Sequence, residues 1–239
     1  MKHFNTVDDL VLDTFKKIAG NANAEHESKR VIDLYLKPAR YYHTINHVWD
    51  MITAMDDITS NTDTLLDYYR LLAIKVATIF HDVIYDCKWS EDESVEMASA
   101  KVWKSVATKL DVVISPELVE YITALIIATQ NHIPCDDHEE TLIFLDADLS
   151  ILGSSRELYL EYAKNIRQEW IHIPDSAYRA GRLGFLTKTL EKTCIFYTRY
   201  GKEKWEPAAR DNMMFELKLL DPSFVLEIHR DRKPNQDSV

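Results

Sequence analysis

Apolar residues recur along this chain at the three- and four-residue spacing of an amphipathic α-helix. Near the amino terminus, for example, Val7, Leu10, Val11 and Phe15 follow this spacing. The same pattern recurs around 48–55 and predicts further helices over 64–81, 91–109, 115–130, 154–171, 176–200 and 205–220. The one short run that suggests a strand, Thr141–Leu145, fits better in a helix. The pattern therefore predicts an all-α fold.

Glycine, proline and asparagine mark the ends of these predicted helices. The breaks fall at Gly20-Asn21, Lys37-Pro38, Ser60-Asn61, Ser115-Pro116, Ile133-Pro134, Gly153-Ser154 and Ile173-Pro174. We expect Ser115 to cap a helix that begins with Pro116, and Asp63 and Ser90 to cap two others. The polar tail 230–239 is expected to fray. Because the sequence has no internal repeat or linker, we predict one all-α helical bundle over residues 1–229.

Composition and charge narrow the classes of function. The 239 residues include only 5 glycines and 7 prolines, which disfavours a glycine-rich all-β sandwich and low-complexity sequence. A hydrophobic content of 46% excludes a wholly disordered chain. The net charge of −11 disfavours a nucleic acid polymer as partner, because binding to duplex phosphates needs clustered Lys and Arg. A small anionic substrate is compatible with this charge, since an acidic surface can contain a local basic or metal-bearing pocket.

Cysteine use and hydropathy indicate a cytoplasmic protein. The three cysteines, Cys87, Cys135 and Cys194, are far apart and form no CxxC pair, which is typical of reduced thiols. The first residues, MKHFNTVDDLVLDTF, lack the apolar segment of a secretory signal. The most apolar stretch, Leu71–Tyr85, is interrupted by charged residues and is too short to span a bilayer, so we expect no membrane association.

Histidine and aspartate stand at positions where a helical core would otherwise hold apolar side chains. They are His43 and His47, four apart where a helix is predicted to begin and so expected on one face of it, His81-Asp82 at the end of the most apolar helix, and Asp146 and Asp148 in FLDADLSILG. A buried imidazole beside a buried carboxylate is costly unless each has a partner. A metal ion satisfies both, since the cation neutralises the carboxylates and the imidazoles supply lone pairs without adding charge.

Each part of this pattern also has a simpler interpretation. A histidine pair four residues apart is more often on the surface or capping a helix than bound to metal. An isolated His-Asp dipeptide is common by chance, and Asp148 alone could cap the helical stretch that follows it. The combination is specific: H-x3-H, then His-Asp after a long apolar helix, then a late aspartate, in that order in an all-α chain.

This combination resembles the HD-domain superfamily of metal-dependent phosphohydrolases, whose pattern is H…HD…D on a helical bundle. The resemblance extends over most of the chain to a branch known only as predicted HD phosphohydrolases, through RYYHTINHV, FHDVIYD, DADLSILG, YAKNIRQEW and WEPAARDNMMFEL. It implies His47, His81, Asp82 and Asp148 as metal ligands, with Asp82 also orienting the attacking water. RYYHTINHV is similar to the YHNxxHA segment of cyclic-nucleotide phosphodiesterases, which implies His43 as the proton donor.

Two assignments stay open at this point. Spacing alone does not decide whether His43 or His47 is the ligand, nor whether Asp146 or Asp148 is, since the two aspartates point about 200° apart on a helix. The sequence also departs from the family pattern, because many members have Gly-Lys after the His-Asp pair and this chain has Val83-Ile84-Tyr85-Asp86. We therefore assign no substrate from the cyclic-dinucleotide or alarmone hydrolase branches.

Further residues are candidates for a second metal or for the substrate. His132 resembles the extra histidine that some family members use for a second metal, although a histidine at a helix end also interacts with the helix dipole. Arg40 precedes His43 by three residues, on nearly the same face, where its guanidinium could hold a phosphate. Glu93 and Arg182 are candidates for substrate contact, for which a first-turn acid and a surface salt bridge are the commoner roles.

The sequence therefore predicts an enzyme, a phosphohydrolase that hydrolyses a small phosphoester, with nucleotides among the candidates, through a metal-activated water. A mixed His/Asp site suits Mn²⁺, Fe²⁺, Mg²⁺, Ni²⁺ or Zn²⁺, as one ion or two. The alternative is a catalytically silent metal-containing module that senses a nucleotide, and a third is a structural protein with buried His–Asp networks. A helical domain with exposed aromatic side chains can also form a homodimer.

Overall fold

The computed structural model describes residues 6–85 and 93–221. In these residues the chain consists of helices and connecting loops without any strand, so the predicted all-α fold is confirmed. The helices are α1 (Val7–Ile18), α2 (Ala24–Tyr35), α3 (Ile45–Ser60), α4 (Tyr68–Phe80), α5 (Val95–Leu110), α6 (Pro116–Ala128), α7 (Glu139–Leu149), the 3-10 helix η1 (Ser150–Gly153), α8 (Arg156–Glu169), α9 (Asp175–Glu191), α10 (Arg199–Lys204) and α11 (Glu206–Leu220). The predicted domain end at residue 229 and the predicted tail 230–239 lie outside the described residues.

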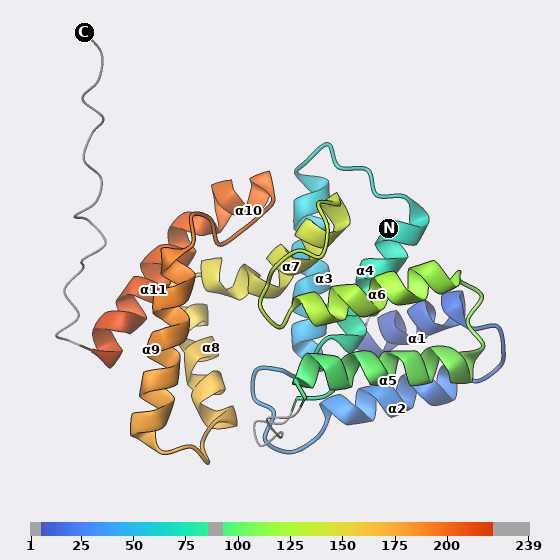
Figure 1. Ribbon diagram of the computed structural model, residues 1–239, viewed down its shortest axis with the longest axis horizontal. Helices are drawn as coiled ribbons and strands as arrows, with labels where there is room; N and C mark the ends of the chain where they lie inside the picture. Colours follow the sequence, from blue (N-terminus) through green and yellow to red (C-terminus); the bar gives the residue numbers. More distant parts are fainter. Residues whose placement is uncertain (1–5, 86–92, 222–239) are drawn as a thin grey trace, which may run out of the picture.

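Two groups of helices lie on either side of α7 (Figure 1). Helices α1 to α6 form one group, in which α4 packs against α6 and α7, and α5 packs against α2 and α6. Helices α8 to α11 form the other group, in which α9 and η1 pack against α11. Helix α7 contacts α3 and α4, and η1 follows directly from it. Helix α7 therefore carries the chain from one group to the other.

The buried apolar side chains form two clusters that meet at the end of α7. The first runs in sequence from Leu10 to Ala147, and the second runs from Leu149 to Leu217. Asp148 stands between the two clusters in the sequence. A carboxylate thus lies at the junction of two apolar cores.

Side chains at the helix starts confirm one predicted cap and correct another. Ser115 caps α6, as predicted. The predicted cap Asp63 is wrong, because α4 begins four residues later and Asp67 accepts its first free N–H groups. Ser94 caps α5, and the predicted cap Ser90 lies outside the described residues. Asp67 has the same side chain as Asp63 and stands one helical turn further along the chain, so the residue type alone does not separate the two caps.

The predicted helix 176–200 is interrupted between α9 and α10. In the intervening segment 192–198, four backbone N–H groups bond to carboxylates instead of to helical carbonyl groups. Glu206 accepts two of them and Asp146 accepts the other two. Bonds between distant parts of the chain leave no signal in the hydrophobic periodicity, so the sequence pattern did not predict this break.

In the part of the chain that the structure describes, no helix is long and apolar enough to cross a membrane.

Candidate metal centre

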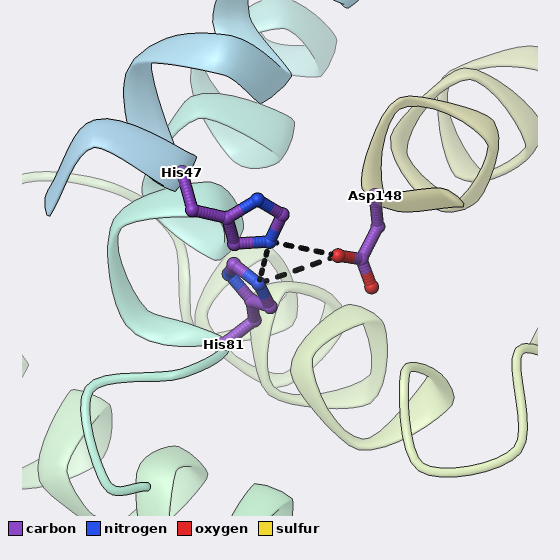
Figure 2. Close-up of side chains that lie close together, drawn as sticks. All are labelled: His47, His81 and Asp148. Atoms are coloured by element: carbon purple, nitrogen blue, oxygen red, sulfur yellow. Dashed lines mark hydrogen bonds and ion pairs between the residues drawn. The ribbon is translucent and has the colours of Figure 1, made fainter. Parts of the chain in front are cut away.

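Two histidines and one aspartate from three helices converge at the junction of the two cores (Figure 2). His47 is in the first turn of α3, His81 directly follows α4, and Asp148 is in the last turn of α7. The Nε2 atoms of His47 and His81 are 3.3 Å apart, and they lie 3.0 and 3.6 Å from Oδ1 of Asp148. One ligand atom of each residue lies within 4.8 Å of the others, and the group could hold a metal ion.

The local sequence explains the orientation of His81. The last five residues of α4 are all buried, and the chain carries His81 into the core directly after them, leaving it 1% exposed. The Nδ1 atom lies 2.9 Å from the carbonyl oxygen of Thr78 and therefore donates to it. The neutral ring then keeps its lone pair on Nε2, which faces His47 and Asp148. This tautomer is the one that a metal ligand needs.

Asp82 places a further oxygen beside the group. Its Oδ2 lies 3.0 Å from Nε2 of His81 and 3.9 Å from Nε2 of His47. Burial would raise the pKa of this carboxyl group, but the imidazoles of His81 and His43 lower the pKa below its ordinary value. Asp82 is therefore a carboxylate at neutral pH. Its predicted roles, as a ligand and as the residue that orients the water, stay predictions.

The nitrogen and oxygen atoms that face one another in this group all carry lone pairs, which repel one another. A positive charge among them is needed to compensate this repulsion. Burial would lower the pKa of His81, but the carboxylates of Asp82 and Asp148 raise it well above its ordinary value, so that a proton compensates the charge. A divalent cation provides the same compensation with more charge, and its binding displaces the proton. Imidazole and carboxylate donors together suit a divalent cation. The residues present therefore fit a metal ion.

His132 bonds to the second oxygen of the same carboxylate. Its Nε2 lies 2.9 Å from Oδ2 of Asp148, whose other oxygen faces His47. The backbone of His132 has a φ of 49°, a left-handed conformation that is uncommon outside glycine. The hydroxyl group of Tyr197 donates to the carbonyl oxygen of His132 and holds the loop in place. His132 thus lies beside the centre, and its predicted part in a second metal site stays a prediction.

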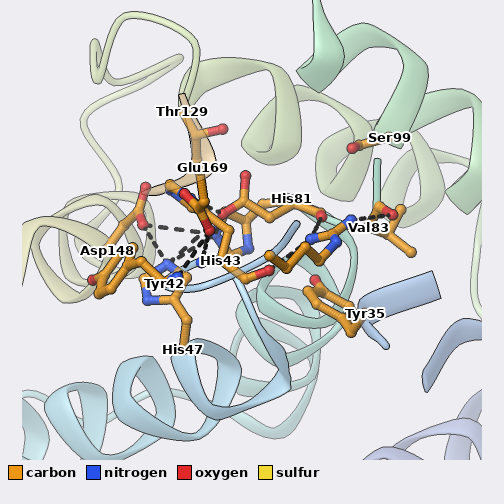
Figure 3. A network of polar contacts seen from close by, with 12 residues as sticks. Tyr35, Tyr42, His43, His47, His81, Val83, Ser99, Thr129, Asp148 and Glu169 are labelled. Carbon is orange, nitrogen blue, oxygen red and sulfur yellow. Dashed lines mark hydrogen bonds and ion pairs between the residues drawn. The ribbon is translucent and has the colours of Figure 1, made fainter. Parts of the chain in front are cut away.

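His43 is held by a buried carboxylate that the sequence pattern did not single out (Figure 3). Oε2 of Glu169, at the end of α8, lies 2.7 Å from Nδ1 of His43. The other oxygen of Glu169 accepts the backbone N–H groups of Tyr41, Tyr42 and His43. The remaining ring nitrogen of His43, Nε2, lies 3.9 Å from Oδ2 of Asp82. One carboxylate thus orients the imidazole toward the candidate centre.

The charges around His43 stabilise its protonated form. Burial would lower the pKa of His43, but the carboxylates of Asp82 and Glu169 raise it above its ordinary value. In the same pair, burial would raise the pKa of Glu169, but the hydrogen bonds from His43 lower it. Both shifts favour the charged pair, in which the Glu169 side chain is buried and the His43 side chain is 16% exposed.

The prediction that His43 and His47 lie on one face of a helix is wrong. Helix α3 begins at Ile45, and Thr44 caps it, so His43 precedes the helix. The two rings still come together, with their centroids 5.9 Å apart, because Glu169 turns the preceding loop toward the first turn of α3.

Arg40 ties the loop before α3 to the loop after α4. Its guanidinium donates to the carbonyl oxygens of His43, Asp82 and Val83, and it lies 5.0 Å from the centre of the Tyr35 ring. These bonds engage the N–H groups that were predicted to hold a phosphate. Arg40 therefore keeps the backbones of His43 and Asp82 together. Its predicted contact with substrate stays a prediction.

A cavity of about 230 Å³ opens beside the centre. Its wall includes His43, Asp82, His132 and Asp148, and it also includes Arg182 from α9. The cavity therefore brings together predicted residues that are far apart in the sequence.

The two weaker substrate candidates have different surroundings. Arg182 is 7% exposed and is bonded through two nitrogens to Glu216, at 2.8 and 2.9 Å. Glu93 forms an ion pair with Lys101 and does not line the cavity. Among the described residues, the glutamate in the cavity wall is Glu96. Glu96 lies nearly one turn further along, on the face of α5 that turns toward the centre. The sequence pattern did not single it out.

No known protein family, no curated protein and no solved structure matches this chain. The geometry of the centre and the order of its residues in the sequence are therefore the basis for assigning a function.

Proposed function

We propose that this chain is a metal-dependent phosphohydrolase of the HD type that acts on a small phosphoester. The observation that carries the proposal is the convergence of His47, His81 and Asp148 beside a cavity that His43 and Arg182 also line. The helical fold and the order of these residues along the chain support it, since both agree with the H…HD…D pattern.

In this proposal His47, His81 and Asp148 hold a divalent cation, and Asp82 supplies a further oxygen. Mn²⁺, Fe²⁺, Mg²⁺, Ni²⁺ and Zn²⁺ all suit such a mixed set of ligands. A bound cation of this kind polarises the phosphoryl group and makes water a stronger nucleophile at neutral pH. Asp82 accepts a hydrogen bond from the attacking water and orients it.

His43 donates a proton to the oxygen that leaves the phosphorus. Because its Nδ1 donates to Glu169, the proton that can be transferred is on Nε2, on the side of Asp82. Proton donation from a positioned imidazole contributes about 10²- to 10⁴-fold to such reactions. Arg182, which is paired with Glu216, is the cationic side chain of the cavity wall that would contact a phosphate group.

The bonds between His43 and Glu169 favour an enzyme over the silent sensor. A sensing module needs the metal ligands but has no use for a proton donor. Here a buried carboxylate orients an imidazole that is not part of the three-residue group. Burial of a charged pair has a desolvation cost, and in this proposal proton donation is the role of the pair.

The test compares two aryl phosphates that differ in their leaving groups. Phenolate is a poorer leaving group than p-nitrophenolate, so hydrolysis of phenyl phosphate depends more strongly on a proton donor. For protein loaded with Mn²⁺, Fe²⁺ or Ni²⁺, we expect metal-dependent hydrolysis of both esters. In His43→Gln, hydrolysis of phenyl phosphate should fall about 100-fold or more, and hydrolysis of p-nitrophenyl phosphate should fall much less.

His26→Gln is the matched control, because His26 is exposed on α2 and the substitution is the same. This variant should retain full activity on both esters. If no metal supports hydrolysis of either ester, or if His43→Gln is as active as the control, the proposed function is contradicted.

A further inference from the structure

An apolar groove lies along helices α8 and α9, next to the cavity of the candidate centre. Its volume is about 420 Å³, and its wall is almost wholly apolar. Its lining includes Ile166 in α8, Trp170 directly after α8, and Tyr178, Gly181, Arg182 and Phe185 in α9. We call it the α8–α9 groove.

The groove adjoins the cavity. Ile166, Arg182 and Phe185 line both spaces. The guanidinium of Arg182, which is paired with Glu216, lies 5.0 Å from the centre of the Phe185 ring, so a cationic side chain and an aromatic face stand side by side at the boundary. A molecule whose phosphate lies in the cavity can therefore extend its other end into the groove.

The groove has few partners for polar groups. Trp170 and Tyr178 have one polar side-chain atom each, and the guanidinium of Arg182 is already bonded to Glu216 and Tyr162. A nucleobase has donors and acceptors along its edges, and burying them without partners costs free energy. An apolar ring has no such cost, gains from burial, and stacks on aromatic side chains. The lining thus favours an apolar ring over a nucleobase.

We propose that the α8–α9 groove binds the apolar aromatic part of the substrate, whose class is therefore an aryl phosphate ester and not a nucleotide. This inference rests on the proposed function, because it takes the candidate centre to bind the phosphate. It adds a specificity site that the metal ligands and the proton donor do not provide.

Two glycines of α9 provide a matched pair of variants. A Cβ atom added at Gly181 or at Gly184 would meet no atom within 4 Å, so a larger side chain at either position starts into open space. Both substitutions replace a helical glycine and raise helix propensity equally. Of the two, Gly181 lines the groove and Gly184 does not. Gly181→Leu therefore fills the groove, and Gly184→Leu is its control.

The measurement is calorimetric titration of Mn²⁺-loaded protein with methylphosphonate and with 1-naphthylmethylphosphonate, whose P–C bonds resist hydrolysis. In the wild type and in Gly184→Leu, we expect the naphthyl compound to bind at least about tenfold more tightly, since burial of one ring supplies that much affinity. In Gly181→Leu the ratio of the two affinities should fall below about threefold, while methylphosphonate binds as before.

Equal affinities in the wild type, or an unchanged ratio in Gly181→Leu, would overturn the proposal. A Gly181→Leu variant that changes only the oligomeric state, measured by light scattering, would also overturn it and would identify the groove as an interface between copies.

Turnover separates this proposal from the proposed function. Hydrolysis of 1-naphthyl phosphate and of glycerol 2-phosphate with equal kcat/KM would retain the hydrolase and overturn the aryl site. A preference for the naphthyl phosphonate that depends on Gly181, without hydrolysis of 1-naphthyl phosphate, would retain the aryl site as a binding site and contradict the hydrolase.

Discussion

The position of His43 depends on a carboxylate 126 residues further along the chain. Glu169 bonds to the imidazole and to three backbone N–H groups of the loop before α3. Both the direction of the ring and the path of the loop therefore depend on one side chain. If His43 is the proton donor, Glu169 is a positioning residue for it.

Substitution Glu169→Gln tests this role. Glutamine keeps a carbonyl oxygen for the backbone N–H groups but removes the charge that faces Nδ1 of His43. We expect kcat for phenyl phosphate to fall about 100-fold, with little change in KM, because the imidazole loses its orientation and its stabilised proton. The fall should be much smaller for p-nitrophenyl phosphate, whose leaving group needs less help. Equal losses of kcat on the two esters would contradict a role through His43 and would indicate a general defect of the fold.

The amino-acid sequence points to some of these residues but not to others. His47, His81 and Asp148 fit the H…HD…D order, so the sequence makes them candidates, with His43 and Asp146 as the alternatives that it leaves open. Glu169 belongs to no motif, and its partner is on a distant element. A signal was present, because Tyr162, Ile166 and Glu169 follow one another at helical spacing on the buried face of α8. A charged residue on an apolar helix face indicates a buried partner.

At the scale of the elements, helix ends position the site. The first turn of α3, the end of α4 and the last turn of α7 supply His47, His81 and Asp148. Periodicity predicted most helix interiors well. Helix ends depend on caps such as Asp67 and on bonds between distant segments, which periodicity does not record.

The sequence pattern also did not decide which of Asp146 and Asp148 binds the metal. Two positions apart on α7, they point in different directions, one to the candidate centre and the other to the segment 192–198. Burial raises the pKa of Asp146 to about 6, against the lowering effect of its bonds to Thr198 and Tyr197. Asp146 therefore has a structural role that spacing alone could not distinguish from metal binding.

Gly201 in α10 tests how tightly this segment is packed. A Cβ atom there would lie 2.6 Å from Oδ2 of Asp146 and 2.8 Å from Cβ of Phe196. We expect Gly201→Ala to lower the free energy of unfolding by about 1 to 3 kcal/mol, as overpacking of a core does. Chemical denaturation measures the change. Gly184→Ala, with open space at its Cβ, should be neutral or more stable by up to about 1 kcal/mol, and equal effects of the two variants would refute the close approach.

At the scale of the whole molecule, the candidate centre lies where the two apolar clusters meet. His47 and His81 come from the first helix group, and Asp148 comes from the helix that leads to the second. Composition and periodicity could predict the fold class, because helix packing follows from the apolar pattern. They could not predict the cavity, which depends on how the two groups pack together, or the α8–α9 groove, which depends on how α8 and α9 lie within the second group.

Metal removal should therefore weaken the whole fold. A cation that binds only the folded protein, at about 100 times its Kd, contributes about 2.7 kcal/mol. For a chain of this length that free energy corresponds to a fall in Tm of about 5 to 10 °C on chelation, measured by scanning calorimetry. Asp148→Asn, which lacks a ligand, should show no response to the chelator. A wild-type Tm that is unchanged by chelation would argue against a structural contribution of the metal.

The central claim is that His47, His81 and Asp148 bind a metal ion, and elemental analysis of protein purified without chelator tests it most directly. We expect about one ion per chain in the wild type, its loss in Asp148→Asn and its retention in Asp146→Asn, because Asp146 bonds only to the segment 192–198 among the described residues. Wild-type protein that stays empty after incubation with Mn²⁺, Fe²⁺, Ni²⁺ and Zn²⁺, or an Asp148→Asn variant that retains the ion, would contradict the claim.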